Sequence, residues 1–80
     1  MIPNVTEFEI LPEYKIKVTL SNGKRGIFDV KPYLDKGIFT ELKDYNYFRN
    51  AHIEYGTITW QHGQDFSPNT IECLMENELN

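Results

Sequence analysis

Residues 13–20 alternate strictly between polar and apolar side chains, a period of two that predicts a half-buried β-strand. The segment that follows, 21–23, reads Ser-Asn-Gly and is typical of a hairpin turn. A two-residue loop would place Phe28 and Val30 on the polar face, whereas a three-residue loop keeps one face of the hairpin apolar. The longer loop needs Gly23 in the left-handed conformation, which a β-carbon disfavours. We therefore predict four cross-strand pairs: Leu20 with Lys24, Val18 with Gly26, Ile16 with Phe28, and Tyr14 with Val30.

Two further segments are predicted to form strands. Residues 6–11 form the strand before the first hairpin, and residues 52–60 form a second hairpin that pairs Ile53 with Ile58. Tyrosine is a poor residue for positive φ, so the Tyr55-Gly56 turn is expected to be a four-residue loop or a less regular connection. The second hairpin is expected to place four residues on one face: Ala51, Ile53, Ile58 and Trp60.

Three helical segments are predicted. A proline near its start predicts a single turn over residues 32–36, and Asp44 is expected to cap a short helix that runs through Arg49. Ser67 is expected to cap the last helix, which has a proline at its first position. Phe48 and a stripe of Ile71, Leu74, Met75 and Leu79 on the last helix are expected to face the core from these segments. Phe39 and Leu42, which follow the first segment, are also expected to be core residues.

Together these elements predict the α+β class. The expected architecture is a small antiparallel β-sheet built from hairpins, with one or two short helices and a C-terminal helix packed on the sheet. A chain of 80 residues has room for one domain only, and we assign residues 1–80 to it.

Charge and cysteine content exclude several classes of function. The formal net charge of −4, with scattered basic residues, argues against direct nucleic-acid binding, which needs clustered lysine and arginine. A single cysteine permits no intrachain disulfide and no multi-cysteine zinc site, which favours a reducing compartment. No apolar run approaches the ~20 residues of a membrane span, and the N-terminus lacks the features of a signal peptide. We therefore expect a cytoplasmic protein that does not associate with membranes.

His62 and Asp65 are the most suggestive candidates for chemistry, because a carboxylate beside a histidine orients many general bases. The pair lacks a nucleophile, since Ser67 is expected to cap a helix. Asp65 is likewise expected to accept backbone N–H bonds in the turn before that helix. A metal site of His52, His62, Asp65 and Cys73 lacks recognised zinc spacing, and Cys73 is expected to be a small, partly buried hydrophobe. We therefore predict no catalytic residue, no metal ligand and no cofactor.

Trp60 is open to two interpretations. It is either a platform for a ligand or a protein partner, or a residue of the core. The core interpretation is favoured, because Trp60 shares its predicted face with Ile53 and Ile58. If this part of the chain does bind a ligand, we expect Trp60, His62 and Asp65 to line the site.

The order of these features resembles the DUF2442 family, a family of domains of unknown function. The most specific similarity lies in the stretch TITWQHGQDFSPNTI, residues 57–71, where the family pattern has Trp, Gly, Asp, an apolar residue and Pro. Gln61 and His62 stand where the family commonly has Pro-Asn. The resemblance implies a small α+β domain without an established activity. The matching residues are Trp60, Gly63, Asp65, Phe66 and Pro68, with Asp29 further upstream.

Members of this family are short bacterial proteins, sometimes fused to a helix-turn-helix segment and sometimes encoded beside another small protein, as in a toxin–antitoxin pair. With no convincing catalytic constellation, we expect a noncatalytic protein-interaction module, antitoxin-like or regulatory, whose protein partner is encoded by a neighbouring gene. The acidic balance of the chain would suit a basic partner. A homodimer is left open, and DNA contact is expected only through a partner or dimerisation. The alternative is a small-molecule, metal-binding or hydrolytic site around Trp60, His62 and Asp65.

Overall fold

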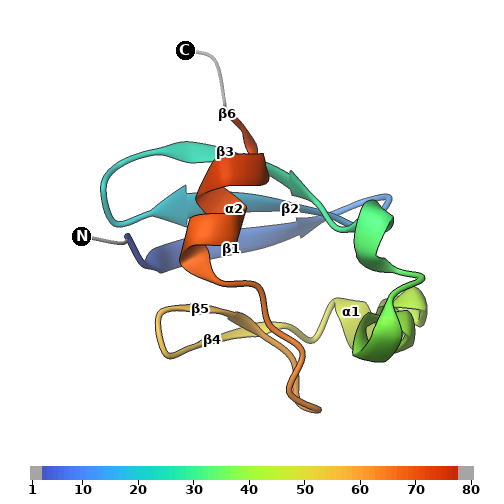
Figure 1. Cartoon of the computed structure of the whole chain (residues 1–80). Helices are drawn as coiled ribbons and strands as arrows, with labels where there is room; N and C mark the ends of the chain where they lie inside the picture. The colour runs from blue at the N-terminus through green and yellow to red at the C-terminus, as the bar shows by residue number, and fades with distance from the viewer. Residues whose placement is uncertain (1–2, 78–80) are drawn as a thin grey trace.

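The computed structural model describes residues 3–77, which form two antiparallel sheets and several short helices (Figure 1). The larger sheet has the strand order β1-β2-β3-β6, and the smaller sheet pairs β4 with β5. The predicted α+β fold is therefore confirmed. No helix in the described part of the chain is long and apolar enough to span a membrane. The elements are β1 (Val5–Leu11), β2 (Lys15–Leu20), β3 (Arg25–Asp29), η1 (Lys31–Tyr33), η2 (Gly37–Lys43), α1 (Tyr45–Phe48), β4 (His52–Glu54), β5 (Thr57–Thr59), α2 (Pro68–Leu74) and β6 (Glu76–Asn77).

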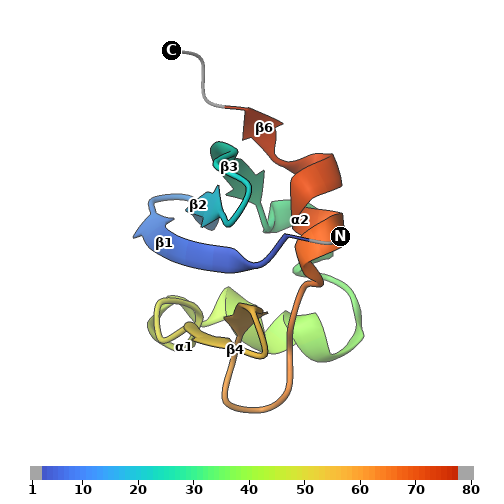
Figure 2. The same cartoon turned by 90° about the vertical axis from the view of Figure 1, so that its left-hand side faces the viewer.

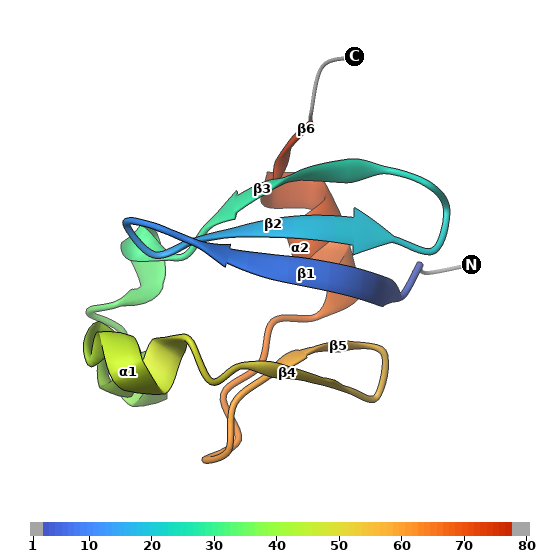
Figure 3. The ribbon, with the colours of Figure 1, turned by 180° about the vertical axis from the view of Figure 1, so that it is seen from behind.

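The larger sheet has one covered face and one open face. Helix α2 lies across one face in Figure 1, and Figure 3 shows the opposite face with no helix over it. The β4–β5 hairpin and α1 lie beyond the β1 edge of this sheet (Figure 2). The core occupies the space between these parts, and its buried residues are Val5, Ile16, Val18, Leu20, Phe28, Val30, Leu34, Leu42, Phe48, Ile58, Trp60, Phe66, Ile71 and Met75.

The β2–β3 hairpin has the predicted register. Gly23 adopts a φ of +88°, and its N–H donates to the Leu20 carbonyl at 3.0 Å. The Leu20 N–H donates to the Lys24 carbonyl at 2.8 Å and closes the bulged three-residue loop. Apart from Ile27, which lies on the open face, both strands therefore present their apolar residues to the covered face of the sheet. The confirmed pairs within the strands are Ile16 with Phe28 and Val18 with Gly26.

Strand β2 begins later than the alternating pattern predicted. Its first residue is Lys15, because Glu13 and Tyr14 adopt left-handed φ values of 64° and 61° in the turn after β1. The predicted backbone pairing is retained, since the Val30 N–H donates to the Tyr14 carbonyl at 2.9 Å. The Tyr14 side chain reaches η2, where its hydroxyl donates to the Lys43 carbonyl. The alternation thus continued into a turn that the pattern alone did not reveal.

The β4–β5 hairpin has the predicted pairing of Ile53 with Ile58 but a different turn. Tyr55 and Gly56 form a two-residue loop with φ values of 52° and 77°, so the expectation of a longer or less regular connection was wrong. A turn of this type matches the natural twist of the two strands. The turn also docks on the larger sheet, because the Val5 N–H donates to the Gly56 carbonyl at 2.8 Å. Strand twist and tertiary contact therefore outweigh the poor preference of tyrosine for positive φ.

Helix α2 begins as predicted and ends early. The Ser67 hydroxyl accepts from the Thr70 N–H at 3.1 Å, and a proline occupies the first helical position. The chain leaves the helix at Met75, where ψ is 145°, and β6 then pairs with β3. The predicted apolar stripe is therefore only partly correct: Ile71 and Met75 are buried, Leu74 is 53% exposed, and Leu79 lies outside the described residues.

Gly26 makes this change from helix to strand possible. A β-carbon at Gly26 would lie 2.5 Å from the Glu76 carbonyl oxygen, so glycine allows β6 to approach β3 closely. The last turns of α2 are also tied to the β2–β3 loop. Asn22 Nδ2 donates to Glu72 Oε2 at 2.9 Å, and Lys24 Nζ lies 3.4 Å from the same oxygen. These contacts fix the end of α2 over β3.

Candidate functional site

The loop that follows β5, residues 60–65, is built around the side chain of Gln64, which is only 1% exposed. Its Oε1 accepts a 2.6 Å hydrogen bond from the Tyr47 hydroxyl. Its Nε2 donates to the Ile38 carbonyl and to Glu41 Oε1, both at 2.9 Å. A buried amide is tolerated when its polar atoms are paired in this way. Gln64 therefore fixes the loop against η2 and α1.

His62 lies at the surface of this loop and is held by Glu41 and Tyr47. Its Nδ1 is 2.7 Å from Glu41 Oε2, and because an ionised carboxylate only accepts, Nδ1 carries a proton. The His62 ring stacks on Tyr47 with centroids 5.2 Å apart, and its backbone N–H donates to the Tyr47 hydroxyl at 2.9 Å. In the neutral ring, Nε2 then has the lone pair that can bind a ligand or accept a proton.

Trp60 belongs to the core. Its side chain is 1% exposed, and its Nε1 donates to the Phe48 carbonyl at 2.8 Å. One face stacks near Phe48 with centroids 6.0 Å apart, and Phe66 meets the ring edge-on at 5.9 Å. An indole whose N–H is paired and whose ring is enclosed packs the interior, and it offers no exposed surface for stacking.

Asp65 and Ser67 do not complete a catalytic triad with His62. His62 takes its carboxylate partner, Glu41, from η2 instead of from Asp65. The Ser67 hydroxyl is used in capping α2. The Asp65 carboxylate was expected to accept backbone N–H bonds, but within residues 3–77 it has no hydrogen-bond partner. The Asp65 backbone forms a β-bridge with Thr59. Of the three expected site residues, only His62 has the fixed, exposed side chain that a site needs.

The residues that hold His62 were missed by the sequence analysis. Glu41 and Tyr47 lie 21 and 15 residues before it, so no local spacing links them to the histidine. Gln64 gave no sequence signal of this role, because it stands in a polar turn segment beside Gly63. A polar residue in such a segment is ordinarily expected at the surface. Its burial is a tertiary property.

Metal ligands are not gathered in the described part of the chain. Among residues 3–77, no group of three or more histidine, cysteine, aspartate or glutamate side chains is arranged to hold a metal ion. Cys73 was expected to be partly buried, but it is exposed in the last turn of α2 because the helix presents Ile71 and Met75 to the core. His52 is exposed on β4 and is paired with Glu54.

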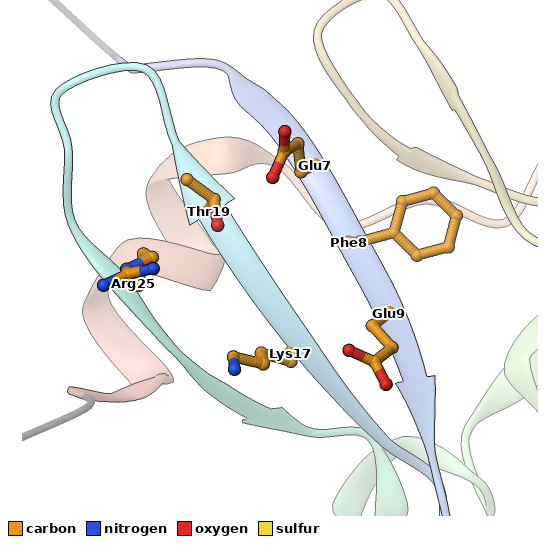
Figure 4. A pocket seen from close by; sticks show the side chains of 6 residues that line it. All are labelled: Glu7, Phe8, Glu9, Lys17, Thr19 and Arg25. Carbon is orange, nitrogen blue, oxygen red and sulfur yellow. The ribbon is translucent and has the colours of Figure 1, made fainter.

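The open face of the larger sheet carries a depression of ≈ 210 Å³ (Figure 4). Glu9 pairs across the strands with Lys17, and Thr19 stands between Glu7 and Arg25. Carboxylates and basic groups thus alternate at cross-strand distances along the face. This mixture is typical of a solvated sheet face, and it gives no concentrated positive charge for a polyanion.

Strand β4 forms the outer edge of the smaller sheet. Its residues His52, Ile53 and Glu54 are all exposed, and among the described residues its only strand partner is β5. Ile53 is 38% exposed although it was predicted to share an inner face with Ile58, because the edge position leaves its outer side uncovered. Tyr55, in the turn, is 96% exposed. Apolar side chains beside an unpaired strand edge are typical of a surface that binds another chain.

Comparison with known families assigns the chain. The family described as Protein of unknown function (DUF2442) matches residues 5–73 of the 80. The chain belongs to the DUF2442 family. The matched region includes the 60–65 loop and the β4 edge, so both surfaces are part of the DUF2442 domain, whereas β6 follows it. No curated protein and no solved structure matches the chain.

The stability of this DUF2442 domain is expected to depend on pH through Glu41. Hydrogen bonds from His62 and Gln64 hold the pKa of the Glu41 carboxyl below its ordinary value of 4.5. A carboxyl with a lowered folded-state pKa stabilises the fold above the unfolded-state value, and this contribution is lost as the pH falls through the lowered value. The difference in unfolding free energy between wild type and Glu41→Gln should therefore be largest above pH 4.5 and shrink below it.

Denaturant titrations of both proteins at a series of pH values measure this difference. Lys43 lowers the pKa of Asp35, and Asn22 lowers that of Glu72, but both carboxyls are present in both proteins and their effects cancel. A difference that is independent of pH, or that grows toward acid, would contradict the role given to Glu41.

Proposed function

We propose that this DUF2442 domain is a noncatalytic protein-interaction module that binds through the β4 edge and the adjacent Tyr55. The supporting observation is that β4 is unpaired on its outer side among the described residues and carries the exposed Ile53. An extended segment of a partner adds a strand to such an edge, where backbone hydrogen bonds give affinity and side-chain contacts give specificity. Ile53 and Tyr55 supply the apolar contacts.

The proposal extends to the setting in which the domain works. We place it in the bacterial cytoplasm, as an antitoxin-like or regulatory component whose partner is encoded by a neighbouring gene. The family resemblance motivates this setting, and the net charge of −4 suits a basic partner. Direct nucleic-acid binding is not part of the proposal, because the open sheet face mixes charges of both signs.

A small-molecule, metal-binding or hydrolytic site around Trp60, His62 and Asp65 has less support. The Trp60 ring is enclosed in the core, so it offers no exposed stacking surface. His62 is oriented by Glu41, but the serine expected nearest to it, Ser67, caps a helix. These observations favour a structural role for most of the segment.

The proposed surface is tested by capturing partners from the native host with tagged protein. We expect Ile53→Lys to reduce the bound partner by more than about tenfold, because a central apolar contact is replaced by a charge that must be desolvated. Ile27→Lys is the matched control. Ile27 is also an exposed strand isoleucine, at 37% against 38% for Ile53, but it lies on the open face of the larger sheet.

The comparison of the two variants decides the proposal. Loss with Ile53→Lys and retention with Ile27→Lys would support the β4 edge, provided that circular dichroism shows both variants folded. Equal binding by the two variants, whether retained or lost, would reject the β4 edge as the binding surface.

A further inference from the structure

The free edge of β4 presents the backbone groups of Ile53. Neighbouring pairs in an antiparallel ladder alternate between hydrogen-bonded and non-hydrogen-bonded pairs. The Ile58 carbonyl accepts from the Phe66 N–H at 3.4 Å, on the side of β5 away from β4, so the pair Ile53–Ile58 is of the non-hydrogen-bonded kind. The N–H and C=O of Ile53 therefore point outward. In Figures 1 and 3, no other labelled element lies along the outer side of β4.

Strand β4 lacks the register shift and the proline that protect the β1 edge of the larger sheet. β1 has a register shift between Val5 and Glu7, and Pro12 directly follows it. In contrast, β4 is regular over all three of its pairs with β5 and contains no lysine and no proline. An edge without a bulge or a proline has the regular geometry that pairing with another strand needs, although its shortness limits the strength of that pairing.

We propose that a second copy of this chain occupies this edge, in an antiparallel pair with its two-fold axis at Ile53. The inference rests on the proposed function, because it names an occupant for the same edge. The two Ile53 residues face each other and exchange two backbone hydrogen bonds. His52 of each copy then faces Glu54 of the other in the non-hydrogen-bonded pairs, where side chains approach most closely. The result is a continuous four-stranded sheet of the order β5-β4-β4-β5.

The order of side chains along β4, a histidine before Ile53 and a carboxylate after it, selects this occupant and this direction. His52 and Glu54 lie on one face of the strand, with Nε2 and Oε2 3.1 Å apart. Antiparallel self-pairing brings the two unlike groups together twice, whereas parallel self-pairing would set Glu54 against Glu54. An interface about a two-fold axis must be self-complementary in this way. Like charges on neighbouring strands destabilise a sheet, whereas an imidazole N–H beside a carboxylate can donate a hydrogen bond to it.

The length of β4 sets the strength of the association. Stable dimers bury roughly 1,200–2,000 Å² in total. A strand of three residues with one exposed turn tyrosine supplies a small part of that area. The dimer is therefore in rapid exchange with the monomer, with a dissociation constant in the range of about 10 μM to 1 mM.

Sedimentation velocity over a range of concentrations from about 10 μM to 1 mM tests the proposal with the purified full chain. The expected result is a weight-average mass that rises toward twice that of the monomer. Ile53→Lys sets two ammonium groups against each other at the axis, so it should weaken association at least about tenfold. Ile27→Lys, on the open face of the larger sheet, should leave association unchanged.

A charge exchange tests the antiparallel register itself. His52→Glu sets a second carboxylate against Glu54 in each cross-strand pair and should weaken the dimer several-fold, whereas the double variant His52→Glu, Glu54→Lys restores unlike pairs and should recover it. A chain that stays monomeric at every concentration would overturn the proposal, as would a dimer that Ile53→Lys does not weaken or the double variant does not restore. Capture of a different partner that depends on Ile53, by a chain that remains monomeric, would reject self-pairing but keep the proposed function. If the chain neither self-associates nor captures a partner through Ile53, the β4 edge is rejected as a binding surface.

Discussion

Trp60→Ala is expected to lower the free energy of unfolding by about 3–5 kcal/mol. The Trp60 side chain is 1% exposed and packs against Phe48 and Phe66, so alanine would leave a large cavity. The change also leaves the Phe48 carbonyl without the indole donor. A domain of 80 residues has only about 4–12 kcal/mol of stability, so the loss is a large fraction of the total. Urea denaturation followed by circular dichroism measures the loss.

Tyr55→Ala is the matched control for this prediction. Tyr55 is also aromatic, but it is 96% exposed, so its removal should change the unfolding free energy by less than about 0.5 kcal/mol. If the unfolding free energy of Trp60→Ala were within about 1 kcal/mol of the wild-type value, the Trp60 ring would not stabilise the core as its packing indicates. The expected result also means that a Trp60 variant that fails to bind a partner reveals little about the binding surface.

Gln64→Leu is expected to destabilise the fold by about 2–3 kcal/mol, although leucine is of similar size and more apolar. The variant removes the acceptor of the Tyr47 hydroxyl and the donor to the Ile38 carbonyl. Polar groups left without partners in a buried setting cost more than the apolar side chain contributes. It also frees Glu41 from one of its two side-chain donors, so the orientation of His62 should loosen.

Gln61→Leu provides the comparison for Gln64→Leu, because Gln61 occupies the same loop but is exposed. Chemical denaturation should show little change for Gln61→Leu, and NMR spectra should show shifts at the Tyr47 ring only for Gln64→Leu. Equal stability of the two leucine variants would mean that the polar network around Gln64 contributes nothing to the fold.

The sequence predicted those parts of the fold that depend on neighbouring residues. The register of the β2–β3 hairpin follows from side-chain alternation and from Gly23, and both are local properties. The helix cap at Ser67 is equally local, since its partner is the Thr70 N–H. These features were predicted correctly because the decisive interactions lie within a few residues of each other or within one hairpin.

The parts that were predicted wrongly depend on distant contacts. The tight turn at Tyr55 is supported by the hydrogen bond between the adjacent Gly56 and Val5, a residue of another sheet. The helix ends at Leu74 because the next residues pair with β3 beside Gly26. The polar network around His62 likewise joins η2, α1 and a loop. No periodicity within one segment encodes such contacts.

The pairing of β6 with β3 has a consequence for how the chain is made. A ribosome completes the β2–β3 hairpin well before it synthesises Glu76, which lies opposite Ile27. The hydrogen bond from the Asn22 side chain to Glu72 likewise cannot form until Glu72, 50 residues later, has been synthesised. Such long-range closure is slow relative to local folding. One edge of β3 therefore stays unpaired until Glu76 and Asn77 are available, and only then can the four-stranded sheet close.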